Sequence, residues 1–378
     1  MRGSTKKRGA TWSYVVDVGT DHATGKRRQL YKRGFPTKKL AEEALTQVLD
    51  QINQRQFVRP VKGTLGAYLI DQWLPTKKHD LRESTWHGYE KQIRAKVVPA
   101  IGHIELSKLD AATLELFYAR LRTEGGANGR PLSPKTVRNI AGIMFSALGD
   151  ATRLRQIGRN PCADTKLQSV GKREMRTWSE REAETFIART REFRLWPLWR
   201  LALATGLRRS ELCGLRWVDV SFDDSTIYVG HTRTTAGRAV VSIPKTNAGF
   251  RTVSVDTGTM TVLRAWKRRQ AEERLAAGAA WADSPYVFTH EDGAPPHPGW
   301  VTKRWNGDVA AVGVPAIRLH DARHTAATIM LRARVPVKVV SERLGHANVG
   351  ITLDVYSHVT KQDDRAAADV LGRVLGDS

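Results

Sequence analysis

The order of hydrophobic and polar residues divides the chain into three stretches with different periods. Residues 11–18, TWSYVVDV, alternate and are rich in β-formers, and RRQLYKRGF (27–35) follows a turn over 20–26, so this part predicts short strands. In TKKLAEEALTQVLDQIN (37–53), Thr37 is the expected N-cap and apolar residues recur on one helical face. The residues of that face are Leu40, Ala44, Leu45, Val48, Leu49 and Ile52. The first stretch therefore predicts a small sheet covered by one helix.

The second stretch has a helical period from residue 64 to about 165. The segments with this helical pattern cover residues 64–74, 84–98, 110–122 and 133–153. Ser84, Asp110 and Ser133 are expected N-caps, and Pro134 suits a first helical position. Breaks rich in glycine and proline separate the runs. This pattern predicts an all-α domain of about four helices.

The third stretch mixes both periods. Ser179 and Glu182 form a capping box that predicts a helix start, and helices are expected to about residue 215. Strands are expected at 225–229, 239–244 and 250–255, with turns at 234–238 and 245–249, a long helix at 257–277 and further helices to the end. This is a mixed α+β pattern. The stretches RPVKG (59–63) and SVGKREMR (169–176) are typical of linkers.

The charge balance indicates what kind of partner the chain binds. The 378 residues contain 61 Lys+Arg and 38 Asp+Glu, a formal net charge of +23, and the sequence pI is about 10.3. The excess is densest at the start, where residues 1–60 hold 13 basic and 5 acidic side chains. Such an excess in a chain of globular composition indicates a polyanion, most simply nucleic acid. An acidic membrane surface is the rival partner, but the sequence has no basic amphipathic anchor and no apolar run of spanning length.

Several other site types find no support in the sequence. The only cysteines, Cys162 and Cys213, are far apart and form no CxxC, which favours neither a disulfide framework nor a zinc site. The basic start MRGSTKKRGATW leads into no apolar segment, so no secretory signal is predicted. No P-loop and no obvious carboxylate cluster for two metal ions occur, which favours chemistry without ATP, metal or other cofactor. A cytoplasmic, nucleoid-associated location fits these features.

Candidate chemistry gathers in four short segments of the third stretch. Each segment alone also fits a surface ion pair, a helix cap or a core aromatic. In their chain order, the residues that could act on a phosphate are Arg208 with Glu211, Lys245, His320 with Arg323, His346 and Tyr356. The pairs Arg208/Glu211 and His320/Arg323 are each three residues apart and so share a helical face.

In this order the segments resemble the successive boxes of the lambda-integrase-like tyrosine recombinases. The boxes are TGLRRSEL (205–212), IPKTNAGFR (243–251), LHDARHT (319–325) and LGHANVGITLDVYSH (344–358). Two departures occur: Ala322 replaces a more usual leucine, which we expect to affect only packing, and Gly249 replaces a more usual serine, which loosens the placement of Lys245.

The resemblance implies a multidomain fold. An arm-type DNA-binding domain of small β-sheet plus helix is expected at 1–58, and an all-α core-binding domain at 62–165. A linker at 166–177 and a mixed α+β catalytic domain at 178–378 follow. In the first domain, the basic side chains expected to enter a DNA groove are Lys26, Arg27, Arg28, Lys32 and Arg33. The alternative is a solvated basic sheet.

The residue types suit attack on a DNA phosphodiester, which builds negative charge on phosphorus. Two guanidiniums, Arg208 and Arg323, offer bidentate phosphate contacts and permanent charge. His346 is expected to bind a phosphate oxygen. Glu211 is expected to orient Arg208 or His320 from behind, although a plain ion pair fits it as well.

Proton transfer accounts for the remaining residues. A phenol with a pKa of about 10 needs its proton removed or its anion stabilised before it attacks. Tyr356 is the expected nucleophile, joined to the 3′ phosphate of the cut strand, and His320 is its expected base or hydrogen-bonding partner. Lys245 is expected to protonate the departing 5′ oxygen, although a simple phosphate contact remains open.

The sequence therefore predicts a site-specific integrase that integrates and excises a mobile element. Its expected partners are double-stranded DNA with core and arm sites, three further copies in a homotetramer on DNA, and accessory proteins such as an excision factor and a DNA-bending protein. No membrane partner is expected. The alternatives are a chromosome-dimer resolvase, a type IB topoisomerase and a DNA-binding regulator with an inactive site. The extra N-terminal domain argues against the resolvase.

Overall fold

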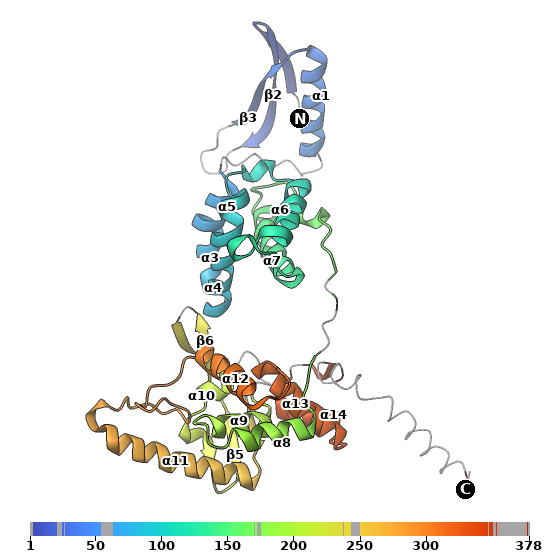
Figure 1. The fold of residues 1–378 in the computed structure, drawn as a ribbon. Helices are drawn as coiled ribbons and strands as arrows, with labels where there is room; N and C mark the ends of the chain where they lie inside the picture. Colours follow the sequence, from blue (N-terminus) through green and yellow to red (C-terminus); the bar gives the residue numbers. More distant parts are fainter. Residues whose placement is uncertain are drawn as a thin grey trace. The chain divides into compact units, whose positions relative to one another are not determined.

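The computed structural model describes residues 3–20, 25, 27–53, 63–169, 171, 175–236, 238–242, 250–346, 348–350, 353 and 376. The chain divides into two compact units, residues 1–171 and 172–378. The first unit holds two separate hydrophobic cores, one under the N-terminal sheet and one among the helices that follow. The multidomain fold expected from the sequence is confirmed (Figure 1). Within the described part of the chain, no helix is both long and apolar enough to cross a membrane.

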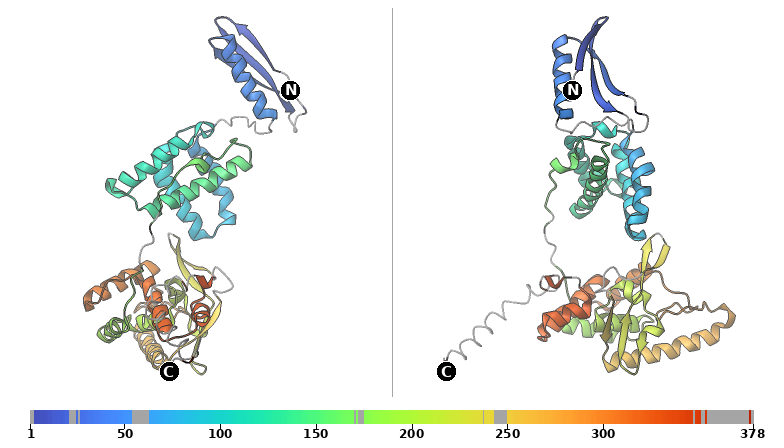
Figure 2. Two further views of the ribbon diagram at one scale, coloured as in Figure 1. Left: turned by 90° about the vertical axis from the view of Figure 1, so that its right-hand side faces the viewer. Right: turned by 180° about the vertical axis from the view of Figure 1, so that it is seen from behind.

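The N-terminal sheet is antiparallel, in the order β1-β2-β3, and one helix covers it (Figure 2). Its elements are β1 (Gly3–Arg8), β2 (Thr11–Thr20), β3 (Arg27–Phe35) and α1 (Lys38–Asn53). Tyr14, Val16 and Leu45 form its buried core. Thr37 caps α1 as predicted, because its hydroxyl accepts the Leu40 N–H at 3.3 Å. Leu40, which was expected on the apolar face of this helix, is 46% exposed.

Strand β1 was not predicted because GSTKKR is an edge strand without an apolar alternation. Its side chains are mostly exposed, and the backbone pairing with β2, from Gly3 opposite Val16 to Arg8 opposite Thr11, is what defines it. Periodicity of hydrophobic residues cannot detect a strand whose stabilisation comes from backbone hydrogen bonds alone.

Four helical stretches follow, at the predicted places. Two of them contain a π-helical segment, so the elements are α2 (Leu65–Ala67), η1 (Tyr68–Trp73), α3 (Leu74–Asp80), α4 (Glu83–Gln92), η2 (Ile93–Val97), α5 (Val98–Ile101), η3 (Leu106–Lys108), α6 (Ala111–Glu124), η4 (Ala127–Gly129), α7 (Pro134–Arg153) and η5 (Pro161–Asp164). Two predicted N-caps are confirmed: the hydroxyl of Ser133 caps α7, and the carboxylate of Asp110 caps α6. Ser84 is not a cap, because its helix begins at Glu83 after the N-cap Arg82.

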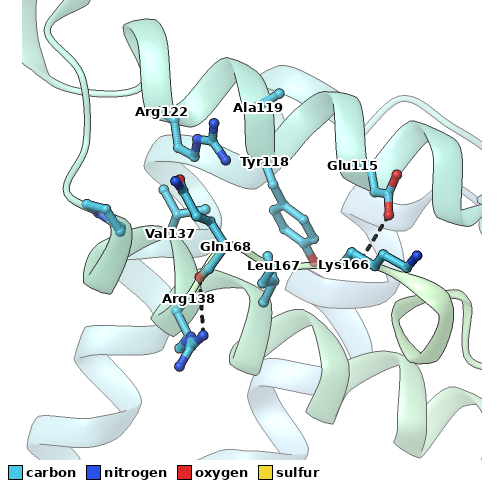
Figure 3. Close-up of a pocket in the computed structure, with 10 residues that line it drawn as sticks. Glu115, Tyr118, Ala119, Arg122, Val137, Arg138, Lys166, Leu167 and Gln168 are labelled. Atoms are coloured by element: carbon cyan, nitrogen blue, oxygen red, sulfur yellow. Dashed lines mark hydrogen bonds between the residues drawn. The ribbon is translucent and has the colours of Figure 1, made fainter. Parts of the chain in front are cut away.

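The chain that leaves this helical core stays attached to it for several residues. The N–H of Lys166 donates to the Glu115 carboxylate at 2.9 Å, and Arg138 donates to the Gln168 carbonyl at 3.2 Å (Figure 3). Leu167 packs against the core between them. The beginning of the expected linker at 166–177 is therefore fixed on α6 and α7.

The second unit combines a small antiparallel sheet, a hairpin and surrounding helices. The sheet has the order β4-β5-β8 and the hairpin pairs β6 with β7. The elements are α8 (Glu180–Arg189), α9 (Trp196–Thr205), α10 (Arg209–Gly214), η6 (Trp217–Asp219), β4 (Val220–Ser221), β5 (Thr226–Val229), β6 (Thr232–Ala236), β7 (Arg238–Ser242), β8 (Arg251–Ser254), α11 (Thr257–Ala277), η8 (Gly278–Ala280), α12 (Pro298–Val312), α13 (Leu319–Arg332) and α14 (Val337–Leu344).

Aromatic packing builds the centre of this unit. Trp178, Phe186, Trp199 and Trp305 are fully buried against one another, with ring centroids 4.9–5.4 Å apart. The capping box of Ser179 and Glu182 at the start of α8 is present as predicted. This core holds α9 and α13 side by side, and the turn after α9 and the helix α13 carry residues of the site described next.

Candidate active site

The turn between α9 and α10 places the first candidate. Gly206 ends α9 in the left-handed conformation, at φ +64°, which glycine adopts without steric cost. An added Cβ there would lie 2.3 Å from Leu344, so a larger residue would also disturb α14. Arg208 then stands at the N-cap of α10, with its backbone extended at ψ 151°. The glycine thus turns the chain so that Arg208 faces α14.

One buried carboxylate organises this corner. Glu211 accepts hydrogen bonds from the backbone N–H of Arg208 at 2.8 Å and from its Nη1 at 2.7 Å. It also accepts two from Arg251 at the start of β8, at 3.2 and 3.0 Å. Burial acts to raise the pKa of Glu211, but the bonds from Arg251 and Arg208 outweigh burial and lower that pKa below its usual value. Glu211 is therefore ionised at neutral pH.

Arg323 on α13 is the most deeply buried cation of the site, at 2% exposure. Its Nη1 donates to the carbonyl of Gly206 at 2.8 Å. Its buried Nη2 has no hydrogen-bond partner among the described residues. Burial first, and then the neighbouring charge of Arg208, lower the pKa of Arg323 to about 9. The guanidinium stays charged at neutral pH, and no anion from the described part of the chain completes its hydrogen bonds.

The first turn of α13 also carries His320, with its ring edge-on to His324 at a centroid distance of 5.0 Å. Burial, then His324 and Arg323, lower the pKa of His320 to about 4. Arg318 and Asp321 form the capping box that begins this helix. At neutral pH His320 is therefore uncharged and able to accept a proton.

The C-terminal end of α14 brings the next box to the same place. Gly345 ends the helix in the left-handed region, and its carbonyl accepts Nη2 of Arg208 at 2.6 Å. The carbonyl of Arg343 accepts Nε of Arg251 at 2.7 Å. Burial, then Arg323 and Arg208, lower the pKa of His346 to about 4. Burial is the largest cause of this low pKa, and the arginines around His346 lower it further.

The structure thus brings Arg208, Glu211, His320, Arg323 and His346 to one corner of the second unit. Arg208 and Arg251 both bond to the carboxylate of Glu211, while Arg323 nearby bonds to the Gly206 carbonyl instead. Among the described residues this leaves an excess of positive charge beside a buried N–H without a partner. Such a site favours an anion with several acceptor oxygens, as a phosphate has. Its chemistry fits stabilisation of negative charge that develops on a bound phosphorus centre.

Two expected site residues cannot be placed. Lys245 and Tyr356 lie outside the described residues, as does Gly249. Among the described residues, Glu211 contacts Arg208, one of its two expected partners, and no bond from Glu211 to His320 is observed. Ala322 is fully buried in the core, where we expected a packing role.

Arg251 is the site residue that sequence reasoning did not single out. Arg251 and Glu211 lie 40 positions apart, and no period in the sequence pairs them. The available signal was its place as the last residue of the IPKTNAGFR box, within the strand expected at 250–255. Only the pairing of β5 with β8 brings it to α10 and α14.

The N-terminal sheet presents a second candidate surface. By strand register, Arg33 lies opposite Ser13 and exposed Tyr31 opposite Val15, on the face away from Tyr14. Arg8 stacks over Tyr31 at 5.9 Å on that face, and Lys6 pairs with Ser13 there as well. We call this surface, with Lys6, Arg8, Arg27, Tyr31 and Arg33, the open face.

The expected groove-contacting set only partly coincides with the open face. Arg27 has an ion pair with Asp17 and is otherwise exposed. Lys32 lies opposite buried Tyr14 and stacks on Phe35, so it belongs to the helix-covered side. Lys26 and the side chain of Arg28 lie outside what the structure describes. Lys6 and Arg8 were missed because β1 was not predicted.

Comparisons with known proteins agree with this division of the chain. Residues 178–363 match the phage integrase family. Residues 3–52 match an arm DNA-binding domain, and residues 67–122 match the N-terminal SAM-like domain of phage integrases. The matches fall on the second unit, the N-terminal sheet and the helical core.

Two relatives align along nearly the whole chain. A XerC-like tyrosine recombinase of Caldanaerobacter subterraneus subsp. tengcongensis is 28% identical over 380 residues, covering 94% of each chain. The ICEBs1 integrase of Bacillus subtilis is 26% identical over 371 residues, covering 96% of this chain and 97% of that one.

Solved structures share the fold at lower identity. The Tn1549 transposon integrase in complex with transposon right end DNA has a TM-score of 0.67 at 21% identity, covering 82% of this chain and 99% of that one. A lambda integrase tetramer bound to a Holliday junction has a TM-score of 0.59 at 16% identity, covering 93% and 94%. These likenesses concern the fold.

Proposed function

Because the chain belongs to the phage integrase family and is a tyrosine recombinase, we propose that it cuts and rejoins DNA strands at specific sites through a covalent bond between Tyr356 and a 3′ phosphate. The reaction integrates and excises a mobile element. Its substrate is double-stranded DNA.

A single observation carries the proposal: the buried Nη2 of Arg323, without a partner among the described residues, beside Arg208 and His346. A cation is costly to bury unless an anion completes its hydrogen bonds. A scissile phosphate supplies that anion, and the charge on its oxygens increases as the tyrosine attacks. The same contacts therefore strengthen in the transition state, which is the condition for catalysis.

The chemistry assigns each remaining group a step. The phenol oxygen of Tyr356 attacks phosphorus, its proton passes to neutral His320, and the bond from phosphorus to the 5′ oxygen breaks. Lys245 gives a proton to that departing 5′ oxygen. In the reverse direction a different 5′-hydroxyl attacks the phosphotyrosine, which releases the tyrosine and joins a new strand. The phosphodiester energy is kept in the covalent bond, so no ATP is consumed.

The N-terminal part supports an integrase over a chromosome-dimer resolvase. Residues 3–52 match an arm DNA-binding domain, and the ICEBs1 integrase aligns with 96% of the chain. We assign arm DNA to a domain at 1–58, core DNA to residues 62–165 and strand cleavage to 178–378, joined by the segment 166–177. Two DNA-binding modules on one chain raise the effective concentration of the second site once the first is bound.

Assembly and accessory factors follow from the same reaction. Exchange between two duplexes needs four active sites, so we propose a tetramer on DNA, in line with the lambda integrase tetramer on a Holliday junction. An excision factor and a DNA-bending protein would control direction and arm geometry. A location in the cytoplasm, associated with the nucleoid, would give access to these DNA sites.

A nicked DNA substrate that traps the covalent intermediate tests this function. The parental chain should form a protein–DNA adduct at one sequence, without ATP and in the presence of a metal chelator, and Tyr356→Phe should form none while it still binds the DNA. Adducts at many unrelated sequences would instead indicate a topoisomerase. Sequence-specific binding without any adduct would indicate a regulator and would contradict the proposal.

A further inference from the structure

Arg251 joins three segments of the site with one guanidinium. It begins β8, where it pairs with Val229 of β5. Its Nη1 and Nη2 donate to the two carboxylate oxygens of Glu211 on α10, and its Nε donates to the carbonyl of Arg343 at the end of α14. Only 8% of the side chain is exposed. The planar fork of arginine is the one side-chain shape that can make all of these bonds together.

Through its bonds to Glu211, Arg251 affects the position of Arg208. The two arginines together supply four hydrogen bonds to the carboxylate, two on each oxygen, so its acceptor sites are fully used. Glu211 is 2% exposed, and no water can replace a lost donor easily. Without Arg251 the carboxylate would be free to rotate toward Arg208, and the Arg208 guanidinium would turn with it.

Through its bond to the Arg343 carbonyl, Arg251 affects the position of His346. The last carbonyls of a helix lack intrahelical partners, and cations stabilise them. Here Arg251 takes the carbonyl of Arg343 and Arg208 takes that of Gly345, so two arginines fix the turn that leads into His346. A shift of this turn would move His346 away from the anion site beside Arg323.

We propose that Arg251 is a positioning residue for strand cleavage: through Glu211 it orients the guanidinium of Arg208, and through the Arg343 carbonyl it fixes the turn that carries His346. It need not touch the phosphate to do this. The inference rests on the proposed function and assigns a further residue that positions the groups of the same active site.

The matched control lies in the same unit. Arg194 also forks onto a partly buried carboxylate, that of Glu273, and donates to a backbone carbonyl, that of Thr289 at 3.2 Å. Both side chains of that pair are 17% exposed, and none of the three residues is part of the site. Arg194→Gln therefore removes a comparable forked ion pair and carbonyl bond at a place where we expect only stability to be affected.

The experiment measures single-turnover cleavage of the nicked substrate at saturating DNA, DNA affinity and the unfolding temperature. We expect Arg251→Gln to bind DNA within about twofold of the parent but to cleave about 100-fold more slowly, the cost typical of misplaced catalytic groups. Arg251→Lys keeps the charge without the fork and should fall between. Arg194→Gln should lower the unfolding temperature and leave the cleavage rate of the folded protein unchanged.

The outcomes separate the inference from the function beneath it. If the parent forms no adduct, the proposed function is wrong. If the parent forms the adduct and folded Arg251→Gln cleaves at the parental rate, or loses no more than Arg194→Gln, then Arg251 has no positioning role. Should Arg251→Gln fail to fold, Arg251→Lys decides, and a parental cleavage rate overturns the inference.

A methylphosphonate substrate, in which a neutral methyl group replaces one charged oxygen of the scissile phosphate, tests whether Arg251 acts through Arg208. Because this phosphate carries one charge fewer, a well-oriented guanidinium is less important for its cleavage. We therefore expect the 100-fold defect of Arg251→Gln to shrink to less than about tenfold on this substrate. An undiminished defect would overturn the assignment of Arg208 as the group that Arg251 positions.

Discussion

The carbonyl oxygen of Gly206 accepts a hydrogen bond from Nη1 of Arg323 at 2.8 Å, across 117 positions of sequence. The bond ties the α9–α10 turn to α13 and points the second nitrogen of the guanidinium, which has no partner among the described residues, into the site. In the proposed reaction, this backbone carbonyl would set where a phosphate oxygen binds.

Inorganic phosphate is expected to stabilise the free protein through this nitrogen. At about 100 times its dissociation constant, a ligand that binds only the folded state adds about 2.7 kcal/mol to the free energy of unfolding. Thermal unfolding with phosphate, against chloride at equal ionic strength, measures the effect. The variant Arg323→Gln should lose it, and an equal response of both proteins to phosphate would show that the ion binds elsewhere.

The variant Gly206→Ala should destabilise the second unit and slow cleavage together. The left-handed backbone costs a residue with a Cβ about 1–2 kcal/mol, and contact with Leu344 adds to that cost. Chemical unfolding and the rate of adduct formation are the measurements. Gly307→Ala is the control: it lies within α12 with open space around it, so alanine there should stabilise by about 0.5–1 kcal/mol. Parental cleavage by Gly206→Ala would contradict the expected role of this turn.

Most of the fold could be predicted from the amino-acid sequence, because the spacing of apolar residues and the capping residues indicate where helices lie. The limits of α11 agree with those expected, and the caps at Asp110, Ser133 and Ser179 are present. β1 and β4 could not be predicted, because one is a polar edge strand and the other has two residues. The turn expected at 234–238 is wrong, because residues 234–236 belong to β6 (Thr232–Ala236) and Arg238 begins β7. The strands β1, β4 and β6 contain no apolar alternation to detect.

The site was predictable as a set of residue types in order, but its connections were not. The order of the boxes named Arg208, His320, Arg323 and His346, and the structure places them at one corner. The bonds of Arg251 depend on strand pairing and on a helix end, which are long-range relationships. The side of the sheet that Lys32 occupies depends on the pairing register of its strand, because a shift by one residue moves every side chain to the opposite face.

Register also separates two neighbouring basic residues in their expected effect on arm DNA. Arg33 lies on the open face and Lys32 on the helix-covered side. We expect Arg33→Gln to weaken binding to an arm-site duplex and to lower the slope of log K against log salt by about 1, because one phosphate contact is lost. Lys32→Gln has the same change in charge and should alter both quantities little. Equal losses for the two variants would argue that net charge, and not the open face, governs binding.

The free energy of unfolding of the second unit is expected to fall as the pH drops below about 6.5. Burial and the arginines lower the pKa of His346 to about 4, and burial with His324 lowers that of His320 to about 4. Between these values and the unfolded pKa of about 6.5, the unfolded state binds more protons than the folded state. Stability is therefore complete above about pH 6.5 and is lost progressively toward pH 4.

The variant His346→Asn isolates one part of this dependence. A single extra proton bound on unfolding changes the free energy by at most about 1.4 kcal/mol per pH unit, so removing His346 should flatten the slope between pH 6.5 and 4 by less than that amount. Urea unfolding at several pH values measures it. Glu211 contributes little between about pH 6.5 and 5. Its bonds to Arg251 and Arg208 outweigh burial and hold the pKa of that carboxyl below its usual value, so its contribution is lost only as the pH falls below the unfolded pKa of about 4.3. If the slope is the same with and without His346, that histidine is not held neutral by the arginines around it, and the positive corner is weaker than its geometry implies.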